Sequence, residues 1–548
     1  MRPARIQARP LSGLGELLGI SASPGGRPRG TSRGAGPGGQ PPGTSREYAA
    51  PGITGVTLDS RQVQPGDLYA ALPGERAHGA DFSGDAVARG AVAILTDPDG
   101  RDRALRALGN VVPPTDGGVP VFVVASPRDR LGEVSCWVYG DPSARMRLIG
   151  VTGTSGKSTT SYLAEAGLRA AGHVTGLIGG VELRVGADRL ASKLTTPEAP
   201  DLQALFALMV ERGVTAAAME VSSHALALGR VAGTRYDVAV FTNLSQDHLD
   251  FHPTFEDYFQ AKAQLFTPRY ASVGVINVAD KYGRRLAAEA TIPVTTFCAL
   301  PGAEGYWGAD WQAHDVRSGA DGSTFRVIGP GGVEDDASVS LPGPFNVANA
   351  LGAIVALVEA GVRLSDAVAG IATCQGVPGR LQRVLPPSGG ATQVDAFVDY
   401  AHKPGAVEAV LRALREVTAG DLIIVLGCGG DRDRGKRPLM GAAATSLADV
   451  AVLTSDNPRS EDPLAILDEM LHGVMEVPRG ERARVVIEPD RGTAINLAVG
   501  MAGKGDVVLV AGKGHETGQY VEGVVLPFDD MAATAEAIAR LGSPEARP

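Results

Sequence analysis

Cysteine is scarce in this 548-residue sequence, and its four copies are scattered. No two of them form a C-x-x-C pair, so the sequence predicts neither a disulfide framework nor a zinc site. Few, unpaired cysteines are typical of a reducing compartment, and we therefore expect a cytoplasmic protein. The four positions are Cys136, Cys298, Cys374 and Cys428.

Long apolar runs and an excess of positive charge are also missing. No stretch approaches the ~18 apolar residues of a membrane span, and the N-terminal residues lack the apolar core of a signal peptide. We therefore expect no membrane insertion. The formal net charge is -10, which argues against nucleic acid as the main partner.

Positive charge gathers only at the start of the chain, where residues 1–50 carry seven arginines against two glutamates. Residues 23–47 are rich in Gly, Pro, Arg and Ser, with hardly an apolar side chain. Such a composition cannot bury enough surface to offset its ordering entropy. We predict a disordered tail over residues 1–50, either a dispensable extension or a mis-assigned start; a nucleic-acid or membrane-surface role rests on this tail alone.

The length predicts three to four domains, and the remaining sequence divides into three blocks. Residues 51–143 mix short strands and turns, residues 144–378 form a larger α/β block, and residues 379–548 alternate strand and helix. The strands of the last block, such as "LIIVLGC" and "DVVLVAG", are apolar without alternation. This pattern is typical of parallel strands covered by helices on both faces, so the sequence predicts an α/β fold.

A polar or glycine-rich cluster follows every predicted strand of the last block. In open parallel sheets, ligands bind beyond the carboxyl ends of the strands, so these clusters indicate a binding site. Any single cluster is equally consistent with an ordinary surface loop. The clusters begin at Tyr400, Gly429, Asp456, Asp490 and Gly512.

One of these clusters, "SDNPRSED" at residues 455–462, contains a rigid turn with a single cation. Pro458 fixes its own φ and moves Asn457 out of the helical region. A guanidinium held on such a turn, here that of Arg459, suits bidentate binding of a carboxylate or phosphate. Taken alone, these residues also fit an ordinary polar turn with a local ion pair.

A phosphate-binding loop is predicted in "RLIGVTGTSGKSTTSYLAEAGLRAAG", which reads as strand, glycine turn and helix. Lys157 can reach the β- and γ-phosphates of a nucleotide, and Ser158 can offer its hydroxyl to Mg²⁺. The common spacing G-x-x-x-x-G-K-[ST] is not met, because Val151 stands five residues before Gly156. The order of elements still favours an ATP site over a structural turn, and no N-K-x-D-like segment points to GTP.

Two polar residues after predicted strands are candidate magnesium ligands. Glu220 ends the strand "AAAME", and His248 lies in "TNLSQDHLDFH". Carboxylate oxygen is a usual Mg²⁺ ligand and imidazole a less usual one, so each could equally be a satisfied polar side chain. Lys262, in "YFQAKAQLF", reads by itself as a solvated helix lysine.

Together, eleven motifs make residues 53–540 resemble the Mur ligase family, the ATP-dependent amino-acid ligases of peptidoglycan precursor synthesis. Within that family the likeness is greatest to members that join meso-diaminopimelate to UDP-MurNAc-L-Ala-D-Glu. The motifs are "TLDSR", "GVTGTSGKSTT", "TTPE", "MEVSSHAL", "FTNLSQDHLDFH", "YFQAKAQLF", "GPFNVANALGA", "VDYAHKPGAV", "GCGGDRDRGKRPLM", "DNPR" and "AGKGHE".

The resemblance implies three domains and a role for each. A uridine-nucleotide-binding α/β domain precedes a central P-loop ATPase-type domain with a parallel sheet, and a Rossmann-like α/β domain carries the incoming amino acid. The implied substrate contacts fall into three groups: Leu58, Ser60, Thr195, Thr196, Ser222 and Arg230 for UDP-MurNAc-dipeptide; Gly153, Thr154, Ser155, Gly156, Lys157, Ser158, Thr159, Asn346 and Asn349 for ATP; Arg432, Asp456, Asn457, Pro458, Arg459, Gly512 and Glu516 for diaminopimelate.

The resemblance also implies the catalytic and metal-binding residues. Lys262 matches the family's carbamylated lysine, whose anionic oxygens hold a second Mg²⁺. The implied catalytic set is Lys157, Glu220, His248 and Lys262, and the implied metal ligands are Ser158, Glu220, His248 and the Lys262 carbamate. In the implied reaction, ATP phosphorylates the D-glutamyl carboxylate and the amine displaces phosphate. No residue is implied as a general base for the amine.

At three positions the sequence departs from the family pattern, which limits the transfer of residue roles from the family. Ser155 stands where the loop often has Asn, Leu228 stands where a Gln often contacts the muramoyl substrate, and "HKPG" replaces a more usual H-T-P-D. Folylpolyglutamate synthetase is the nearest rival, although it lacks the uridine domain and the "DNPR" turn. A P-loop switch without ligation is the alternative from another class. We expect a monomer acting on small-molecule substrates.

Overall fold

The computed structural model describes residues 2–20, 52–109, 118–249, 251–319, 321–385 and 394–541. The chain forms two compact units, the first from residues 1–150, 174–237 and 248–272, the second from residues 151–173, 238–247 and 273–548. Strands β5 (Arg147–Thr152), β10 (Tyr236–Phe241) and β11 (Ala271–Asn277) begin in the first unit and end in the second. Each unit is described by itself.

The first unit begins with a four-stranded sheet in the order β1-β2-β3-β4, in which every pair is parallel. The remaining strands of this unit pair in the order β9-β6-β7-β8, with β6 parallel to β9 and antiparallel to β7. Its other elements are α1 (Leu11–Leu18), β1 (Gly55–Thr57), β2 (Asp67–Ala70), α2 (Ser83–Ala88), β3 (Ala93–Thr96), α3 (Pro98–Gly109), β4 (Val121–Val123), α4 (Pro127–Tyr139), β6 (Thr175–Ile178), β7 (Glu182–Val185), β8 (Asp188–Ala191), α6 (Ala199–Glu211), β9 (Ala216–Glu220), α7 (Ser223–Ala227) and α8 (Phe255–Ala263).

The second unit contains a mixed run of strands and a six-stranded sheet. Strands β13, β14 and β15 pair antiparallel after β11 and β12. Its elements are α5 (Lys157–Ala170), α9 (Lys281–Glu289), β12 (Val294–Cys298), β13 (Trp311–Gly319), β14 (Gly322–Ile328), β15 (Glu334–Val339), α10 (Pro344–Glu359), α11 (Leu364–Ala372), β16 (Gln382–Arg383), β17 (Asp395–Asp399), α12 (Pro404–Arg415), β18 (Leu422–Cys428), α13 (Lys436–Leu447), β19 (Val450–Ser455), α14 (Pro463–Glu476), β20 (Arg484–Ile487), α15 (Arg491–Met501), β21 (Val507–Ala511), β22 (Gly518–Val521), β23 (Val524–Pro527) and α16 (Asp530–Leu541).

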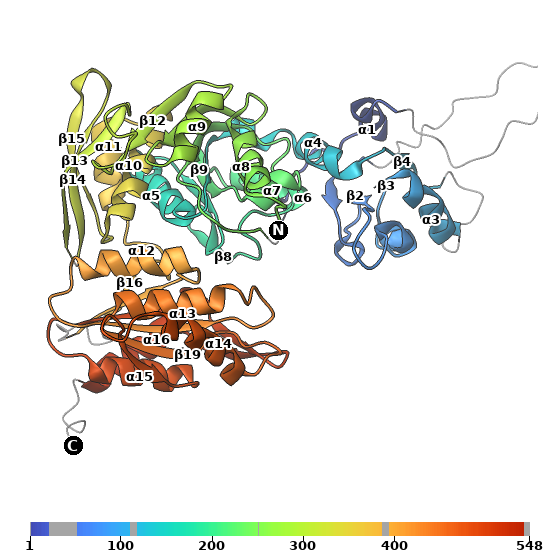
Figure 1. Cartoon of the computed structure of the whole chain (residues 1–548). Coiled ribbons are helices and arrows are strands. Elements are labelled where there is room, and N and C mark those ends of the chain that lie inside the picture. Colours follow the sequence, from blue (N-terminus) through green and yellow to red (C-terminus); the bar gives the residue numbers. More distant parts are fainter. Residues whose placement is uncertain are drawn as a thin grey trace, which may run out of the picture. The chain divides into compact units, whose positions relative to one another are not determined.

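The six-stranded sheet confirms the predicted parallel sheet of the last block. Its order is β16-β17-β21-β18-β19-β20, and only β16 is antiparallel to its neighbour (Figure 1, orange to red). Along β18, Ile424 and Leu426 pack with the helices α12, α13 and α14, whereas Ile423 and Val425 pack with α15 and α16. Both faces are therefore buried, which explains the lack of polar alternation in these strands.

The predicted parallel strands of the middle block are joined by antiparallel ones. The antiparallel strands β13 to β15 and the hairpin strands β7 and β8 make the pairing mixed. In β14 buried and exposed side chains alternate, as expected for an antiparallel strand with one solvated face. The apolar runs that were read as strands fall in the parallel part.

The predicted disordered tail is wrong for residues 2–20. Helix α1 has Leu14 fully buried and Leu18 nearly so, and both belong to the apolar core shared with β1 to β4 and α4. Arg9 exchanges backbone hydrogen bonds with Ile53 at 2.7 and 2.8 Å. The helix is rich in leucine, a signal that the composition of the whole tail conceals. Residues 23–47, on which the prediction rested, lie outside the described residues.

Replacing Leu14 with alanine tests this helix. We expect Leu14→Ala to lower the free energy of unfolding by ~2–5 kcal/mol, because it removes fully buried methyl groups from the core. Glu16→Ala, on the exposed face of the same helix, is the matched control and should change stability by less than ~0.5 kcal/mol. Urea unfolding followed by the fluorescence of Trp137, which packs on this core, measures both. Equal stability of the two variants would contradict a docked helix.

Candidate functional site

The predicted phosphate loop connects β5 to α5 in the second unit. Gly153 has φ +149° and Gly156 has φ +87°, conformations that side chains rarely adopt. A Cβ at Gly153 would lie 1.9 Å from the Thr242 hydroxyl, and one at Gly156 would lie 2.3 Å from Asn349 Oδ1. Both glycines are therefore required by backbone conformation and by close packing.

Asn243, at the end of β10, braces this loop and was not singled out from the sequence. Its carbonyl accepts the Thr154 N–H at 3.0 Å, and its Oδ1 accepts the Ser155 N–H at 3.0 Å. Its Nδ2 donates to the Ser155 carbonyl at 3.1 Å. The only sequence signal was its place directly after an apolar strand. Asn243 thus sets the shape of the loop through three hydrogen bonds.

Lys157 and the two predicted asparagines lie close to the loop and its helix. Lys157, the first residue of α5, donates from Nζ to the carbonyls of Gly153 and Thr154 at 3.1 and 2.9 Å. Asn346 and Asn349, on α10, are buried, and Asn349 donates to Asn346 Oδ1 at 3.2 Å. Asn349 also accepts the Thr160 hydroxyl at 3.5 Å. The structure therefore brings the two asparagines to the first turns of α5.

Ser158 and Thr159 are buried in the first turn of α5, directly after the lysine. A helix N-terminus carries backbone N–H groups and a positive dipole end, both favourable for phosphate. The geometry of the loop and helix together suits the binding of a nucleotide phosphate.

A second polar cluster lies in the first unit, at the carboxyl end of β9. The buried Glu220 accepts the Gly180 N–H at Oε1 at 3.0 Å. The Thr196 hydroxyl donates to the Glu220 carbonyl at 2.9 Å and accepts the Ser222 N–H at 3.1 Å. Ser222 also caps α7 by accepting the Ala225 N–H. The structure thus groups Glu220, Thr196 and Ser222; Thr195 lies beside Gly180.

Arg230, another predicted substrate contact, is held by protein carboxylate. Its Nε lies 2.8 Å from Glu198 Oε1, aligned as an ion pair rather than as a hydrogen bond. Arg128 approaches the same carboxylate at 3.4 Å. Glu198 is the last residue of the "TTPE" motif, so its partners tie this motif to two arginines of the first unit. Leu58 and Ser60 lie in the same unit directly after β1, with Ser60 buried.

An aromatic cluster surrounds His248 in the first unit. The ring centroid of His248 lies 4.7 Å from that of His224, and His224 stacks on Phe251 at 4.1 Å. His248 has φ +53°, an uncommon conformation for a residue other than glycine. Lys262, on α8, is 2% exposed and its Nζ lies 4.7 Å from the Tyr258 ring centroid. The interpretation of Lys262 as a solvated helix lysine is therefore wrong.

The third cluster lies at the carboxyl ends of β19 and β21 in the six-stranded sheet. Asp456 is buried, and burial raises the pKa of its carboxyl group. Gly512 has φ +117°, and a Cβ there would lie 2.5 Å from Asp456 Oδ2. The close approach of these two residues explains why glycine is needed at 512.

Lys513, which was not predicted, joins two residues of this cluster. Its fully buried Nζ donates to Asn457 Oδ1 at 2.9 Å and to Glu516 Oε2 at 3.2 Å. Asn457 Nδ2 donates to the same oxygen of Glu516 at 2.9 Å. A buried ammonium needs such partners, so Lys513 fixes the orientation of both.

Arg459 is held firmly on both sides of its backbone. Its N–H donates to the Tyr520 carbonyl at 2.8 Å, and its carbonyl accepts the Glu522 N–H at 2.6 Å, both from the hairpin β22–β23. It adopts φ +54°, a strained conformation for arginine. Its Nη1 donates to the Gly430 carbonyl at 2.6 Å, which uses one of the five guanidinium N–H donors.

The two acidic residues that follow the turn, Glu461 and Asp462, bond to partners other than Arg459. Asp462 caps α14 by accepting the Leu464 N–H, as expected from the helix dipole. Glu461 lies before this cap and pairs with Arg437 instead of with Arg459. The alternative interpretation, a polar turn held by a local ion pair of Arg459, is therefore wrong. Pro458 is buried, and Arg432 lies exposed on the loop after β18.

Among the residues that the structure describes, no group of three or more His, Cys, Asp or Glu side chains could hold a metal ion, so the predicted set with Ser158 and a modified Lys262 stays a prediction. No described helix is long and apolar enough to cross a membrane.

Comparison with known families identifies all three blocks of the chain. The Mur ligase family catalytic domain matches residues 52–133, the Mur ligase middle domain matches residues 151–357, and the Mur ligase glutamate ligase domain matches residues 379–514.

Individual proteins match over nearly the whole length. The UDP-N-acetylmuramoyl-L-alanyl-D-glutamate–2,6-diaminopimelate ligase of Streptomyces coelicolor is 55% identical over 98% of both chains, and that of Streptomyces avermitilis is 57% identical over 98% of both. A solved structure of a ligase with the same name is 32% identical, with a TM-score of 0.63, over 92% of this chain and 98% of that one.

Proposed function

This chain belongs to the Mur ligase family, and from that premise we propose that it adds meso-diaminopimelate to UDP-MurNAc-L-Ala-D-Glu in an ATP-dependent reaction of peptidoglycan precursor synthesis. The observation that carries the proposal is the 55–57% identity to two diaminopimelate ligases over 98% of the chain. The Arg459 turn supports it, because diaminopimelate has one more carboxylate than lysine and a guanidinium can bind it in bidentate fashion.

The reaction requires activation of a carboxylate, since a carboxylate and an amine do not condense spontaneously in water. The γ-phosphoryl group passes from ATP to the D-glutamyl carboxylate, the amine of diaminopimelate attacks the acyl phosphate, and inorganic phosphate leaves. Lys157 and the N-terminus of α5 stabilise the negative charge on the transferring group. Gly153, Thr154, Ser155, Gly156, Ser158, Thr159, Asn346 and Asn349 form the rest of the proposed ATP site.

Each unit offers candidate ligands for Mg²⁺. In the first unit Glu220 offers a buried carboxylate at a strand end, and the proposed set also includes His248 and the buried Lys262 as a carbamate. In the second unit Ser158 offers a hydroxyl at a helix N-terminus. When bound, Mg²⁺ supplies Lewis-acid stabilisation of phosphoryl and carboxylate oxygens.

The remaining proposed roles concern the binding of the two other substrates. Leu58, Ser60, Thr195, Thr196, Ser222 and Arg230 bind UDP-MurNAc-dipeptide, with Arg230 oriented by Glu198. Arg432, Asp456, Asn457, Pro458, Arg459, Gly512 and Glu516 bind diaminopimelate. We further propose that the enzyme acts in the cytoplasm as a monomer, without nucleic-acid partners or membrane insertion. None of the four cysteines, all of which the structure describes, forms a disulfide, which agrees with a reducing compartment.

The proposal is tested by phosphate release with ATP and UDP-MurNAc-L-Ala-D-Glu, comparing meso-diaminopimelate with L-lysine. We expect kcat/KM to be at least about 30-fold higher with diaminopimelate, because lysine lacks the second carboxylate that the Arg459 guanidinium is proposed to bind. Phosphate release without any amino acid is the control for a nucleotide switch. Equal rates with both amino acids would reject the proposed specificity, and amino-acid-independent release would reject ligation.

A further inference from the structure

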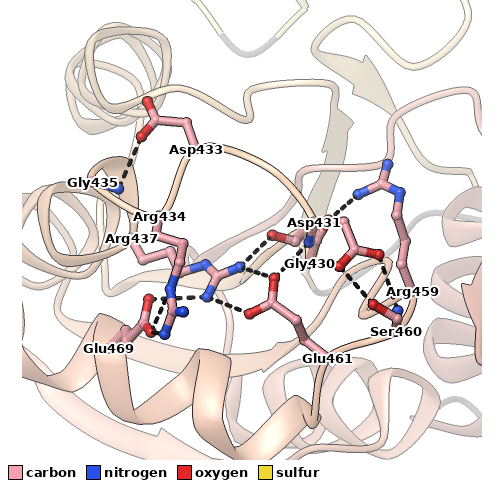
Figure 2. A network of polar contacts seen from close by, with 11 residues as sticks. Gly430, Asp431, Asp433, Arg434, Gly435, Arg437, Arg459, Ser460, Glu461 and Glu469 are labelled. Atoms are coloured by element: carbon pink, nitrogen blue, oxygen red, sulfur yellow. Dashed lines mark hydrogen bonds and ion pairs between the residues drawn. The ribbon is translucent and has the colours of Figure 1, made fainter.

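A charged network joins the loop after β18 to the turn that carries Arg459 (Figure 2). Its centre is Arg437, in the first turn of α13, whose side chain is fully buried. Nη2 and Nη1 of Arg437 donate to the two carboxylate oxygens of Glu461 at 2.7 and 2.9 Å. Nη1 also donates to Glu469 at 2.9 Å, and Nη2 donates to the Gly429 carbonyl at 3.2 Å.

Glu461 also forms a hydrogen bond with the loop after β18. Its Oε1 accepts the backbone N–H of Asp431 at 2.5 Å while it is held by Arg437. Hydrogen bonds from Arg437 lower the pKa of Glu461 to about 2, so the carboxylate is charged throughout the physiological range. Asp431 has φ +52°, a conformation that this bond helps to maintain.

Two residues of this loop, Gly430 and Asp431, form hydrogen bonds with the turn that carries Arg459. Asp431 accepts the Ser460 hydroxyl at 2.7 Å and the Ser460 N–H at 3.2 Å. Gly430 donates its N–H to the Asn457 carbonyl at 2.9 Å and accepts Nη1 of Arg459 at 2.6 Å. A Cβ at Gly430 would lie 1.9 Å from the Pro458 carbonyl. Loop and turn are therefore in direct contact, and the Arg459 guanidinium is oriented by a loop carbonyl.

We propose that Arg437 is a positioning residue, which fixes the guanidinium of Arg459 for the second carboxylate of diaminopimelate through Glu461 and the Gly430–Asp431 backbone. This inference rests on the proposed role of Arg459. Arg437 itself does not touch the substrate. Its place in the "GKRPLM" stretch gave no such signal, because its partner Glu461 lies 24 residues further along the chain.

Another arginine of the same network, Arg434, provides a control variant. Arg434 pairs with the same Glu469 through Nε at 3.0 Å, but no described bond links it to Glu461 or Asp431. Its side chain is largely exposed. Replacing Arg434 removes a charge from the same network and leaves the path to Arg459 intact.

The test compares Arg437→Lys, Arg437→Met, Glu461→Gln and Arg434→Met by steady-state phosphate release. We expect both Arg437 variants and Glu461→Gln to raise the KM for diaminopimelate by about 10- to 100-fold, with the KM values for ATP and UDP-MurNAc-dipeptide unchanged. Arg437→Lys keeps the charge and most of the volume, so it remains informative if Arg437→Met unfolds. Arg434→Met should leave all three KM values unchanged.

A double variant distinguishes positioning from general stability. Because Arg437 acts through Glu461, the Arg437→Lys/Glu461→Gln enzyme should have a diaminopimelate KM no higher than the worse single variant. Additive effects, or an equal rise in all three KM values, would overturn the proposal. So would a lowered melting temperature with unchanged KM for diaminopimelate. If wild-type enzyme does not prefer diaminopimelate, the proposed function fails instead, which the same assay shows separately.

Discussion

Arg459→Ala is expected to abolish efficient use of diaminopimelate while ATP binding survives. Loss of a charge-assisted bidentate contact in a desolvated pocket costs roughly 2–5 kcal/mol, or ~30-fold to several-thousand-fold in kcat/KM for diaminopimelate. The guanidinium is fixed by the Gly430 carbonyl and the backbone by the hairpin β22–β23, so the side chain is already oriented on the turn before substrate binds. Steady-state kinetics with each of the three substrates varied in turn provides the measurement.

Two further variants separate the side chain from its strained backbone. Arg459→Gly removes the guanidinium and relieves the strain of φ +54°, whereas alanine retains that strain. Arg459→Lys keeps the charge but loses the planar fork. If the guanidinium binds substrate, glycine and alanine should give the same kinetic defect and differ only in stability. An unchanged KM for diaminopimelate in Arg459→Ala would reduce the residue to a part of the turn.

The strand, glycine turn and helix of the proposed phosphate loop were predictable because their determinants are neighbours in the chain. Gly153 and Gly156 lie in the turn between β5 and α5, and Lys157 begins the helix. Asn243 could not be predicted in the same way, since it is about 90 residues distant and reaches the loop only through β10. Long-range pairing of strands, which the sequence does not display, decides such contacts.

The third cluster, at the carboxyl ends of β19 and β21, shows the same division between features that were predictable from the sequence and contacts that were not. Asp456, Asn457, Gly512 and Glu516 were predicted from the polar ends of two strands and do lie together. Which cation binds which carboxylate was not predictable, because Glu461 pairs with Arg437, 24 residues away, rather than with its close neighbour Arg459. Glu516 pairs with Lys513. The Arg459 side chain donates to the Gly430 carbonyl, which agrees with its proposed role in binding substrate.

Lys157→Ala is expected to remove phosphoryl transfer without altering recognition of the amino acid. The Nζ atom of Lys157 lies over the carbonyls of Gly153 and Thr154, at the N-terminus of α5 where phosphate charge is stabilised. Removing one preorganised electrostatic partner of a transition state costs about 3–4 kcal/mol, so kcat should fall by ~100- to 1000-fold. Phosphate release under saturating substrates measures this fall.

Lys157→Arg is the matched control, because it keeps the positive charge on a longer, planar group. It should lie between wild type and alanine in kcat if position as well as charge matters. Diaminopimelate binding to Lys157→Ala, measured by calorimetry in the presence of ATP and UDP-MurNAc-dipeptide, should be preserved, whereas Arg459→Ala should lose it. A fall in kcat of less than about threefold in Lys157→Ala would show that the loop holds the nucleotide without stabilising the transferred phosphoryl group.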